Sequence, residues 1–130
     1  MSSRILVTAA IIENAGKYLI TKRLKNATSF PNLWEFPGGK VESDEKLKDC
    51  LEREIFEELG IKIKARDVFG RASYANNKSH IEIVGFYCDH ISREIRHLEI
   101  QNHKYVYPNE MKDYDFCPAD LFFIKKLKGS

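Results

Sequence analysis

The sequence predicts a mixed α+β domain in which helices pack against a sheet. Runs rich in β-branched residues stand before and after one long helical pattern, and a second helical pattern closes the chain. This order of strands, helix, strands and helix is typical of an α+β architecture. The chain has 130 residues, the size of one compact domain, and contains no internal repeat or low-complexity tract. We therefore expect residues 1–130 to form a single domain.

The N-terminal part is expected to begin with a hairpin. Residues 5–12 (ILVTAAII) and 17–22 (KYLITK) have strand composition, and residues 13–16 (ENAG) between them favour a turn. Residues 24–33 (LKNATSFPNL) are typical of a surface loop. A glycine-rich turn follows at residues 37–39 (PGG).

The central helix is expected to begin at Ser43 or Asp44, since either side chain can cap a helix N-terminus. It should run to about Leu59. Gly60 then stands where a C-terminal cap belongs, because glycine readily adopts the left-handed conformation that ends many helices.

The second half of the chain predicts more strands and a final helix. Strands are expected at residues 68–74 and 80–88, with a turn at Asn76 and Asn77, and a weaker strand at 104–107. Pro118 then opens a helix (ADLFFIKKLK), whose lysines suit the negative end of the helix dipole.

Composition argues against several functions. Lys and Arg number 21 against 19 Asp and Glu, so a net charge of +2 gives no broad basis for binding polymeric nucleic acid or an anionic membrane. No apolar run approaches the ~18 residues of a membrane span, and the N-terminus lacks the signal-peptide pattern. Cys50, Cys88 and Cys117 are odd in number and far apart, which favours buried free thiols in a reducing compartment, the cytoplasm.

The run REIFEEL places Glu54, Glu57 and Glu58 within five residues of the predicted helix. At about 100° per residue, the three carboxylates share an arc of roughly 100°. That arc continues the inward-facing apolar stripe of the preceding turns, which consists of Leu47, Cys50 and Leu51. An acidic run is more often a solvated helix face, but inward-facing carboxylates incur desolvation and repulsion unless positive charge lies nearby.

A divalent cation is the strongest candidate for that positive charge. Lys40, Arg53 or Lys62 could supply part of it, but a cation concentrates more charge in one place. Oxygen ligands with no histidine or cysteine beside them favour Mg²⁺ or Mn²⁺. The glycines of the preceding turn would let backbone groups approach a metal or a phosphate closely.

These residues together resemble a known family. Gly39, Glu45 and residues 53–61 (REIFEELGI) occupy every fixed position of the Nudix box, G-x5-E-x7-R-E-U-x-E-E-x-G-U, over residues 39–61. The flank WEFPGGK at residues 34–40 and the overall layout resemble the MutT-like branch over nearly the whole chain. The resemblance implies the Nudix fold, an α/β/α sandwich around a mixed sheet. It also implies hydrolysis of nucleoside triphosphates to monophosphates and pyrophosphate.

The resemblance assigns roles to the helix and turn residues. It implies metal ligation by Glu54, Glu57 and Glu58, joined by a backbone carbonyl of Gly38 or Gly39. It implies that Arg53 and Glu45 brace the helix and orient the carboxylates. A metal-held water, deprotonated by a glutamate or by the metal's charge, would then attack phosphorus.

One loop position departs from the family pattern. Many MutT-like enzymes carry a glutamate in the loop before the last strand, as an extra ligand or base. That position is Gln101 here, and Glu99 is two residues away. Which residue fills the role of loop acid stays open at this point.

The resemblance also implies substrate contacts. Arg23 is similar to an arginine near the phosphates, and Phe36 would lie under the nucleoside; the alternatives are a solvated strand end and a core aromatic. Tyr74 aligns with a nucleotide-contacting position but differs in residue type. Gly38, Gly39 and Lys40 complete the expected substrate contacts.

Asp120, in the segment FCPAD, is similar to the residue that reads the base. The branch specific for oxidised guanine has asparagine there, whereas aspartate resembles the branch acting on CTP and modified cytosine nucleotides. An ionised carboxylate accepts hydrogen bonds from the cytosine amino group, but a guanine edge also offers donors. The alternative is an acid in the first turn of a helix.

The leading hypothesis is a Mg²⁺-dependent nucleoside triphosphate diphosphatase of the cytidine or modified-nucleotide type. The first alternative is an 8-oxo-dGTP sanitising enzyme. The second is a non-catalytic module that senses a nucleotide. The sequence is compatible with either a monomer or a homodimer.

Overall fold

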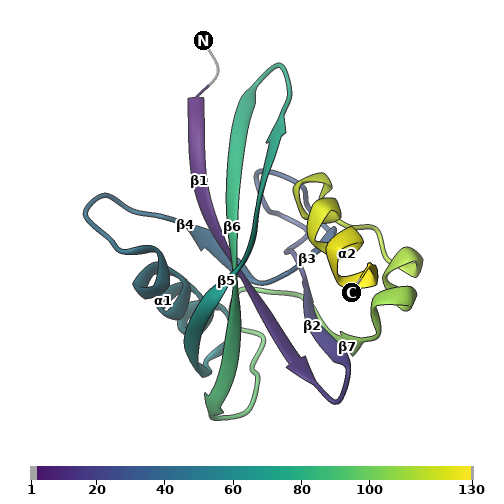
Figure 1. The fold of residues 1–130 in the computed structure, drawn as a ribbon. Coiled ribbons are helices and arrows are strands. Elements are labelled where there is room, and N and C mark those ends of the chain that lie inside the picture. Colours follow the sequence, from purple (N-terminus) through teal and green to yellow (C-terminus); the bar gives the residue numbers. More distant parts are fainter. Residues whose placement is uncertain (1–2, 130) are drawn as a thin grey trace.

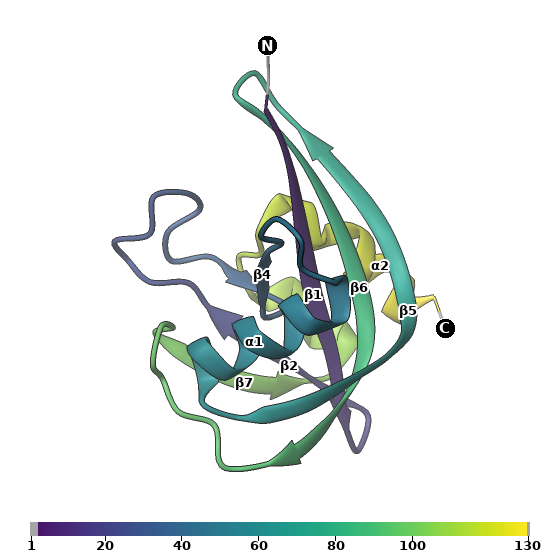
Figure 2. The ribbon, with the colours of Figure 1, turned by 90° about the vertical axis from the view of Figure 1, so that its left-hand side faces the viewer.

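The computed structural model describes residues 3–129, which form a seven-stranded mixed sheet with helices on both faces (Figures 1 and 2). The α+β fold class predicted from the sequence is confirmed. The elements, in chain order, are β1 (Ser3–Asn14), β2 (Lys17–Lys22), β3 (Trp34–Glu35), β4 (Gly38–Lys40), α1 (Leu47–Leu59), β5 (Lys62–Ala75), β6 (Ser79–Ser92), β7 (Asn102–Val106), two 3-10 helices, η1 (Pro108–Asp113) and η2 (Pro118–Asp120), and α2 (Leu121–Lys128).

Strand β1 is the centre of the sheet. It runs parallel to β6 from Ser3 opposite Ser79 to Ile12 opposite Cys88. On its other side it pairs antiparallel first with β4 and then, near its end, with β2. Strands β2, β4 and β6 are therefore all held in place by backbone hydrogen bonds to β1.

Two apolar cores lie on opposite faces of the sheet. Helix α1 packs Leu51, Ile55 and Leu59, all fully buried, into the core on one face. Helix α2 packs Phe123 and Leu127 into the other core. Figure 2 shows α1 in front of the sheet and α2 behind it.

The predicted helix ends are correct at one end of α1 and wrong at the other. Gly60 has φ 70° and donates its N–H to the carbonyl of Phe56, as expected of a C-terminal cap. Neither Ser43 nor Asp44 caps the N-terminus, because Asp44 has φ 68° and the helix begins only at Leu47. The last helix also begins late, since residues Pro118–Asp120 form a 3-10 turn before it.

The strands differ from the sequence prediction in extent. The hairpin after β1 is confirmed, with Ala15 at φ 54° and Gly16 at φ 84°. Strands β5 and β6 are longer than predicted, each 14 residues. The expected glycine turn is in part strand β4, because Gly38 pairs so closely with β1 that a Cβ there would collide with the Thr8 carbonyl.

The three cysteines are buried and free, as predicted. Burial raises the pKa of the Cys50 thiol to about 11 and that of Cys88 to about 12. Within residues 3–129, no helix is long and apolar enough to cross a membrane.

Candidate active site

Arg53 organises acidic residues just before α1 and within it. Its Nε and Nη2 donate to the two carboxylate oxygens of Glu45 at 2.6 and 3.0 Å. Its Nη1 donates to Glu54 and to Glu57, both at 3.1 Å. We call Glu45, Glu54 and Glu57 the braced acids. Hydrogen bonding from Arg53 lowers the pKa of Glu45 to about 2, so this carboxylate stays ionised.

The prediction that the three helix glutamates lie along the inward stripe is correct only in part. The Glu54 side chain is 17% exposed, whereas that of Glu57 is 48% exposed. The buried stripe follows Leu51, Ile55 and Leu59, which are spaced by four residues and so drift around the helix away from Glu57. Glu57 therefore lies at the solvent rim of the cluster.

Gly39, in strand β4, allows this strand to pack closely against helix α1. A Cβ at Gly39 would collide with the carboxylate of Glu54, so only glycine lets this side chain lie against the backbone of β4. The Gly39 carbonyl accepts a hydrogen bond from the Thr8 hydroxyl at 3.3 Å. The glycine pair and the acidic helix thus form one packed unit, as the sequence predicted.

Glu58 faces the interior rather than Arg53. It lines a cavity with Arg23, Glu35 and Glu99, and its pKa is raised well above the usual value by burial, by Glu35 and by Glu54. A cluster of carboxylates with so little compensating charge is suited to a hard divalent cation, because all its donors are oxygens. The pKa of Glu58 would fall once a cation lay beside it.

The structure distinguishes the two candidates for the loop acid. The backbone N–H of Glu99 donates to the carbonyl of Glu58 at 3.2 Å, and both side chains line the same cavity. Gln101 instead turns away, and its amide nitrogen donates to the carbonyl of Arg23 and to Asn32 Oδ1. Glu99 is therefore the loop acid that lies with the helix glutamates.

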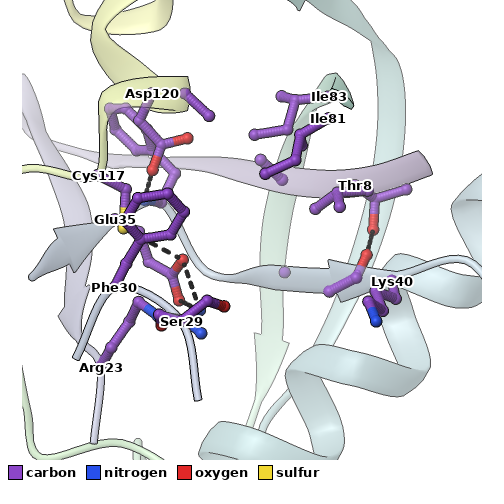
Figure 3. Close-up of a pocket in the computed structure, with 16 residues that line it drawn as sticks. Thr8, Arg23, Ser29, Phe30, Glu35, Lys40, Ile81, Ile83, Cys117 and Asp120 are labelled. Atoms are coloured by element: carbon purple, nitrogen blue, oxygen red, sulfur yellow. Dashed lines mark hydrogen bonds and ion pairs between the residues drawn. The ribbon is translucent and has the colours of Figure 1, made fainter. Parts of the chain in front are cut away.

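A second cavity lies beside the acidic helix, between the central strands and the start of α2 (Figure 3). Six of the seven predicted substrate residues line it: Arg23, Phe36, Gly38, Gly39, Lys40 and Asp120. Tyr74 is not among its lining residues. Its ring packs edge-on against that of Phe30, with centroids 6.3 Å apart, and Phe30 does line the cavity.

The structure also decides between alternatives that the sequence left open. Arg23 is not a solvated strand end, since its Nη1 lies 3.2 and 3.3 Å from the two Glu35 oxygens and its Nε donates to the carbonyl of Ser29. Phe36 is a core aromatic, 2% exposed, and it lines the cavity as well. Both environments are compatible with substrate contact.

Asp120 is buried in the wall of this cavity and is 2% exposed. It does not cap α2 through its side chain; its Oδ2 accepts a hydrogen bond from the Phe36 N–H at 3.2 Å. Figure 3 shows the other carboxyl oxygen directed toward the space in front of Ile83 and Ile81. Burial, reinforced by Glu35, raises the pKa of Asp120 well above its usual value.

Sequence analysis missed Glu35 and Cys117, which lie beside Asp120. A bridge between Trp34 and Phe116 brings the two segments together, a pairing without a local sequence signal. Burial outweighs the attraction of Arg23 and raises the pKa of Glu35 to about 6. We call Glu35, Glu58 and Asp120, the three carboxyls whose pKa is raised by desolvation, the buried acids; by exposure Asp120 is fully buried and the other two are half-buried.

The buried acids also bear on where a metal could bind. Within residues 3–129, the group of three potential ligand side chains with atoms within 4.8 Å of one another is Glu35, Cys117 and Asp120, not the three helix glutamates. Glu54 and Glu57 both turn to Arg53, while Glu58, which is also hydrogen-bonded to Glu54, lines the cavity with Glu35 and Glu99. Binding of one cation by all three would draw these side chains together.

Comparison with known proteins gives a consistent result. The family model described as NUDIX domain matches residues 3–129. The chain is 36% identical over 120 residues to the CTP pyrophosphohydrolase of Escherichia coli (strain K12), covering 90% of this chain and 86% of that protein. It is 30% identical over 136 residues to the Nucleoside triphosphatase NudI of Escherichia coli O139:H28 (strain E24377A / ETEC), covering 95% of each. The solution structure of the E. coli ORF135 protein superposes with a TM-score of 0.85 at 30% identity, covering 98% of this chain and 91% of that one.

Proposed function

Because the chain belongs to the NUDIX domain family and is a hydrolase acting on nucleoside triphosphates, we propose that it is a magnesium-dependent diphosphatase of the cytidine type. Its products would be a nucleoside monophosphate and pyrophosphate, and modified cytidine nucleotides belong to the same substrate class. The observation that carries this proposal is the buried carboxyl of Asp120, which has one oxygen directed into the cavity. The similarity to a CTP pyrophosphohydrolase supports it.

Burial affects whether the Asp120 carboxyl is protonated, and its protonation state determines which nucleobase it can hydrogen-bond. A neutral carboxyl both donates and accepts, which complements the ring nitrogen and the amino group of cytosine. An ionised carboxylate only accepts, which complements the two donors on a guanine edge. Since burial and Glu35 favour the neutral form, the cavity is better suited to cytosine.

The acids of α1 are proposed to hold the metal and prepare the attacking water. Glu54, Glu57 and Glu58 would be ligands, with Glu99 and a carbonyl of Gly38 or Gly39 nearby. A bound Mg²⁺ or Mn²⁺ would neutralise phosphate oxygens and acidify water. Glu58, which lines the cavity together with Glu99, would accept the proton of that water. Arg23 and Lys40 line the second cavity, which contains Asp120 and which we call the nucleotide cavity. Their side chains would bind phosphate oxygens.

A nucleotide panel tests the proposal. Purified protein with Mg²⁺ is expected to release pyrophosphate from CTP, dCTP or a modified cytidine triphosphate, with the monophosphate as the second product. A Glu57→Gln preparation, purified identically, controls for contaminating phosphatases. Absence of hydrolysis of every triphosphate with either Mg²⁺ or Mn²⁺ would overturn it.

Asp120→Asn tests the base-reading step. Asparagine keeps a donor and an acceptor but cannot ionise, so the turnover ratio of CTP to 8-oxo-dGTP should become independent of pH. In the wild type this ratio should fall as pH rises and Asp120 loses its proton. An unchanged ratio at all pH values in both proteins would show that Asp120 does not read the base.

The 8-oxo-dGTP alternative is favoured by one observation. Glu35 lies beside Asp120, and two acids in one wall could serve the several donors of an oxidised guanine. Side-by-side turnover of CTP and 8-oxo-dGTP separates the two substrate classes. Tight binding of a nucleotide without turnover at any metal would instead support a sensing module.

We further propose that residues 1–130 form one domain that acts on free nucleotides in the cytoplasm. The match of the family model over residues 3–129 and the buried free thiols support this. It would bind neither polymeric nucleic acid nor membranes. Size-exclusion chromatography with light scattering would decide between monomer and homodimer.

A further inference from the structure

We propose that Gln101 is a positioning residue that fastens Arg23 and the loop of residues 24–33 against the bound nucleotide. This inference rests on the proposed function, since it concerns how the nucleotide cavity keeps its shape. It assigns to Gln101 a role different from that of the loop acid found at this position in many relatives.

The contacts of Gln101 determine the orientation of its amide. Its Nε2 donates to the Arg23 carbonyl at 2.9 Å and to Asn32 Oδ1 at 2.6 Å, and its backbone N–H donates to the Lys22 carbonyl at 2.9 Å. Because a backbone carbonyl can only accept, the side-chain nitrogen must face Arg23. Both hydrogens of the amide are therefore in use, and a carboxylate could not replace it.

The loop that Gln101 holds has a backbone that needs outside support. Phe30 has φ 51° and Asn32 has φ 65°, both in the left-handed region that is costly for residues other than glycine. Inside the loop, the Arg23 N–H donates to the Leu33 carbonyl and Arg23 Nε donates to the Ser29 carbonyl. The bond from Gln101 to Asn32 adds a tether from outside the loop, at one of the two strained residues.

The tether bears on substrate binding because the loop forms one wall of the nucleotide cavity. Ser29 and Phe30 line that cavity, and Figure 3 shows Arg23 beneath them. Arg23 also lines the neighbouring cavity with Glu58 and Glu99. Loosening the loop should therefore weaken nucleotide binding, while the acids of α1, which the loop does not hold, keep their arrangement.

Gln101→Glu separates the two roles by the sign of its effect. If a side chain at position 101 could reach the metal, a carboxylate there would act as an additional ligand. Activity would then rise, or the Mg²⁺ concentration for half-maximal activity would fall. If Gln101 is a tether, the carboxylate would face the Arg23 carbonyl, which can only accept, and repel it. We expect KM to rise roughly fivefold or more, because one net hydrogen bond contributes about that factor, with kcat changed by less than about twofold.

Gln101→Ala should show the same split, a higher KM with kcat and the Mg²⁺ requirement unchanged. Asn102→Ala is the matched control, since among residues 3–129 the Asn102 side chain accepts a hydrogen bond only from the adjacent His103 N–H. Asn32→Gly removes one acceptor while allowing the positive φ, so its effect and that of Gln101→Ala should be less than additive. Equal KM values in Gln101→Ala and the control, or higher activity in Gln101→Glu, would overturn the proposal.

Limited trypsin digestion tests the tether without depending on turnover. Lys25 is exposed in the loop, and we expect Gln101→Ala to be cleaved there several-fold faster than the wild type and the Asn102→Ala control. Equal cleavage rates would overturn the tether even in an active enzyme. Conversely, faster cleavage in a protein that hydrolyses no nucleotide would support the tether and reject only the proposed function.

Discussion

Glu45 and Glu35 are both glutamates hydrogen-bonded to an arginine, yet their pKa values move in opposite directions. Glu45 receives two short bonds from separate nitrogens of Arg53, and its pKa falls to about 2. Glu35 shares one nitrogen of Arg23 at 3.2 and 3.3 Å and is desolvated, and its pKa rises to about 6. The two side chains are almost equally exposed, 17% for Glu45 and 18% for Glu35. An arginine nearby therefore does not by itself keep a carboxylate ionised; the geometry of its hydrogen bonds and the desolvation of the carboxyl decide the balance.

The same contrast divides the site into two parts. The braced acids are held in place by Arg53, and the lowered pKa of Glu45 keeps that carboxylate ionised, as suits a cluster that attracts a cation. Burial raises the pKa values of the buried acids, as suits residues that would meet a base, a water or a metal directly. Four predictions test this division, in order of decreasing effect.

Glu58→Gln should produce the largest loss. Removing this carboxylate should lower kcat at least ~100-fold, since metal-ligand and base roles are typically each worth that much. The variant should also unfold at a higher urea concentration, because a buried carboxyl with a raised pKa is a cost to the fold. Steady-state kinetics and urea titration measure both effects. Glu94→Gln, at an exposed position, is the control, and equal activity of the two variants would contradict the assignment.

Arg53→Ala should break the braced set. Without its four hydrogen bonds, Glu45, Glu54 and Glu57 repel one another and lose their orientation. The Mg²⁺ concentration for half-maximal activity should rise roughly 10- to 100-fold, the usual cost of losing a residue that orients metal ligands. A metal titration of activity measures this. An unchanged metal requirement would show that the brace serves only the stability of the helix.

Glu35→Gln should alter the pH dependence of stability. The pKa of Glu35 is about 6 in the fold against an ordinary value of 4.5. Its contribution to stability is therefore complete below about pH 4.5 and is lost as pH rises through about 6. The glutamine variant has no carboxyl to ionise at this position and so does not lose stability in this way. The difference in free energy of unfolding, variant minus wild type, should therefore increase by about 2 kcal/mol between pH 4.5 and 7.5. Urea unfolding at the two pH values measures the difference, and a constant difference would mean that Glu35 ionises freely.

Arg66→Ala should have the smallest effect. Arg66 and Asp89 form an ion pair at 2.7 Å, but their side chains are 54% and 57% exposed. An exposed pair contributes little, so the free energy of unfolding should change by less than about 0.5 kcal/mol. A loss comparable to that of breaking a buried pair would show that distance, not burial, governs the ion pairs of this protein.

The same division explains what sequence analysis could predict. The braced acids lie within 13 residues of one another, so helical spacing and the box motif were sufficient to group them. The burial of Glu57 was predicted wrongly because the apolar stripe drifts around the helix toward Ile55 and Leu59. Glu35 was missed because it meets Cys117 and Asp120 only through the pairing of distant segments. The delayed start of α1 reflects the left-handed backbone of Asp44, which its residue type does not dictate.

The pairing of β1 with β4 has a consequence for the reaction. Val7, Thr8 and Ala9 line the nucleotide cavity, and the same three residues pair with the strand that touches Glu54. For a nucleotide held by its base as proposed, the distance between the base and the acidic helix would be set by these three β1–β4 residue pairs of the sheet and not by a loop. In that arrangement the sheet would set the distance, and the length of the phosphate chain would select which phosphorus reaches the acids. The position of bond cleavage would then depend on the backbone pairing of this protein as much as on its glutamates.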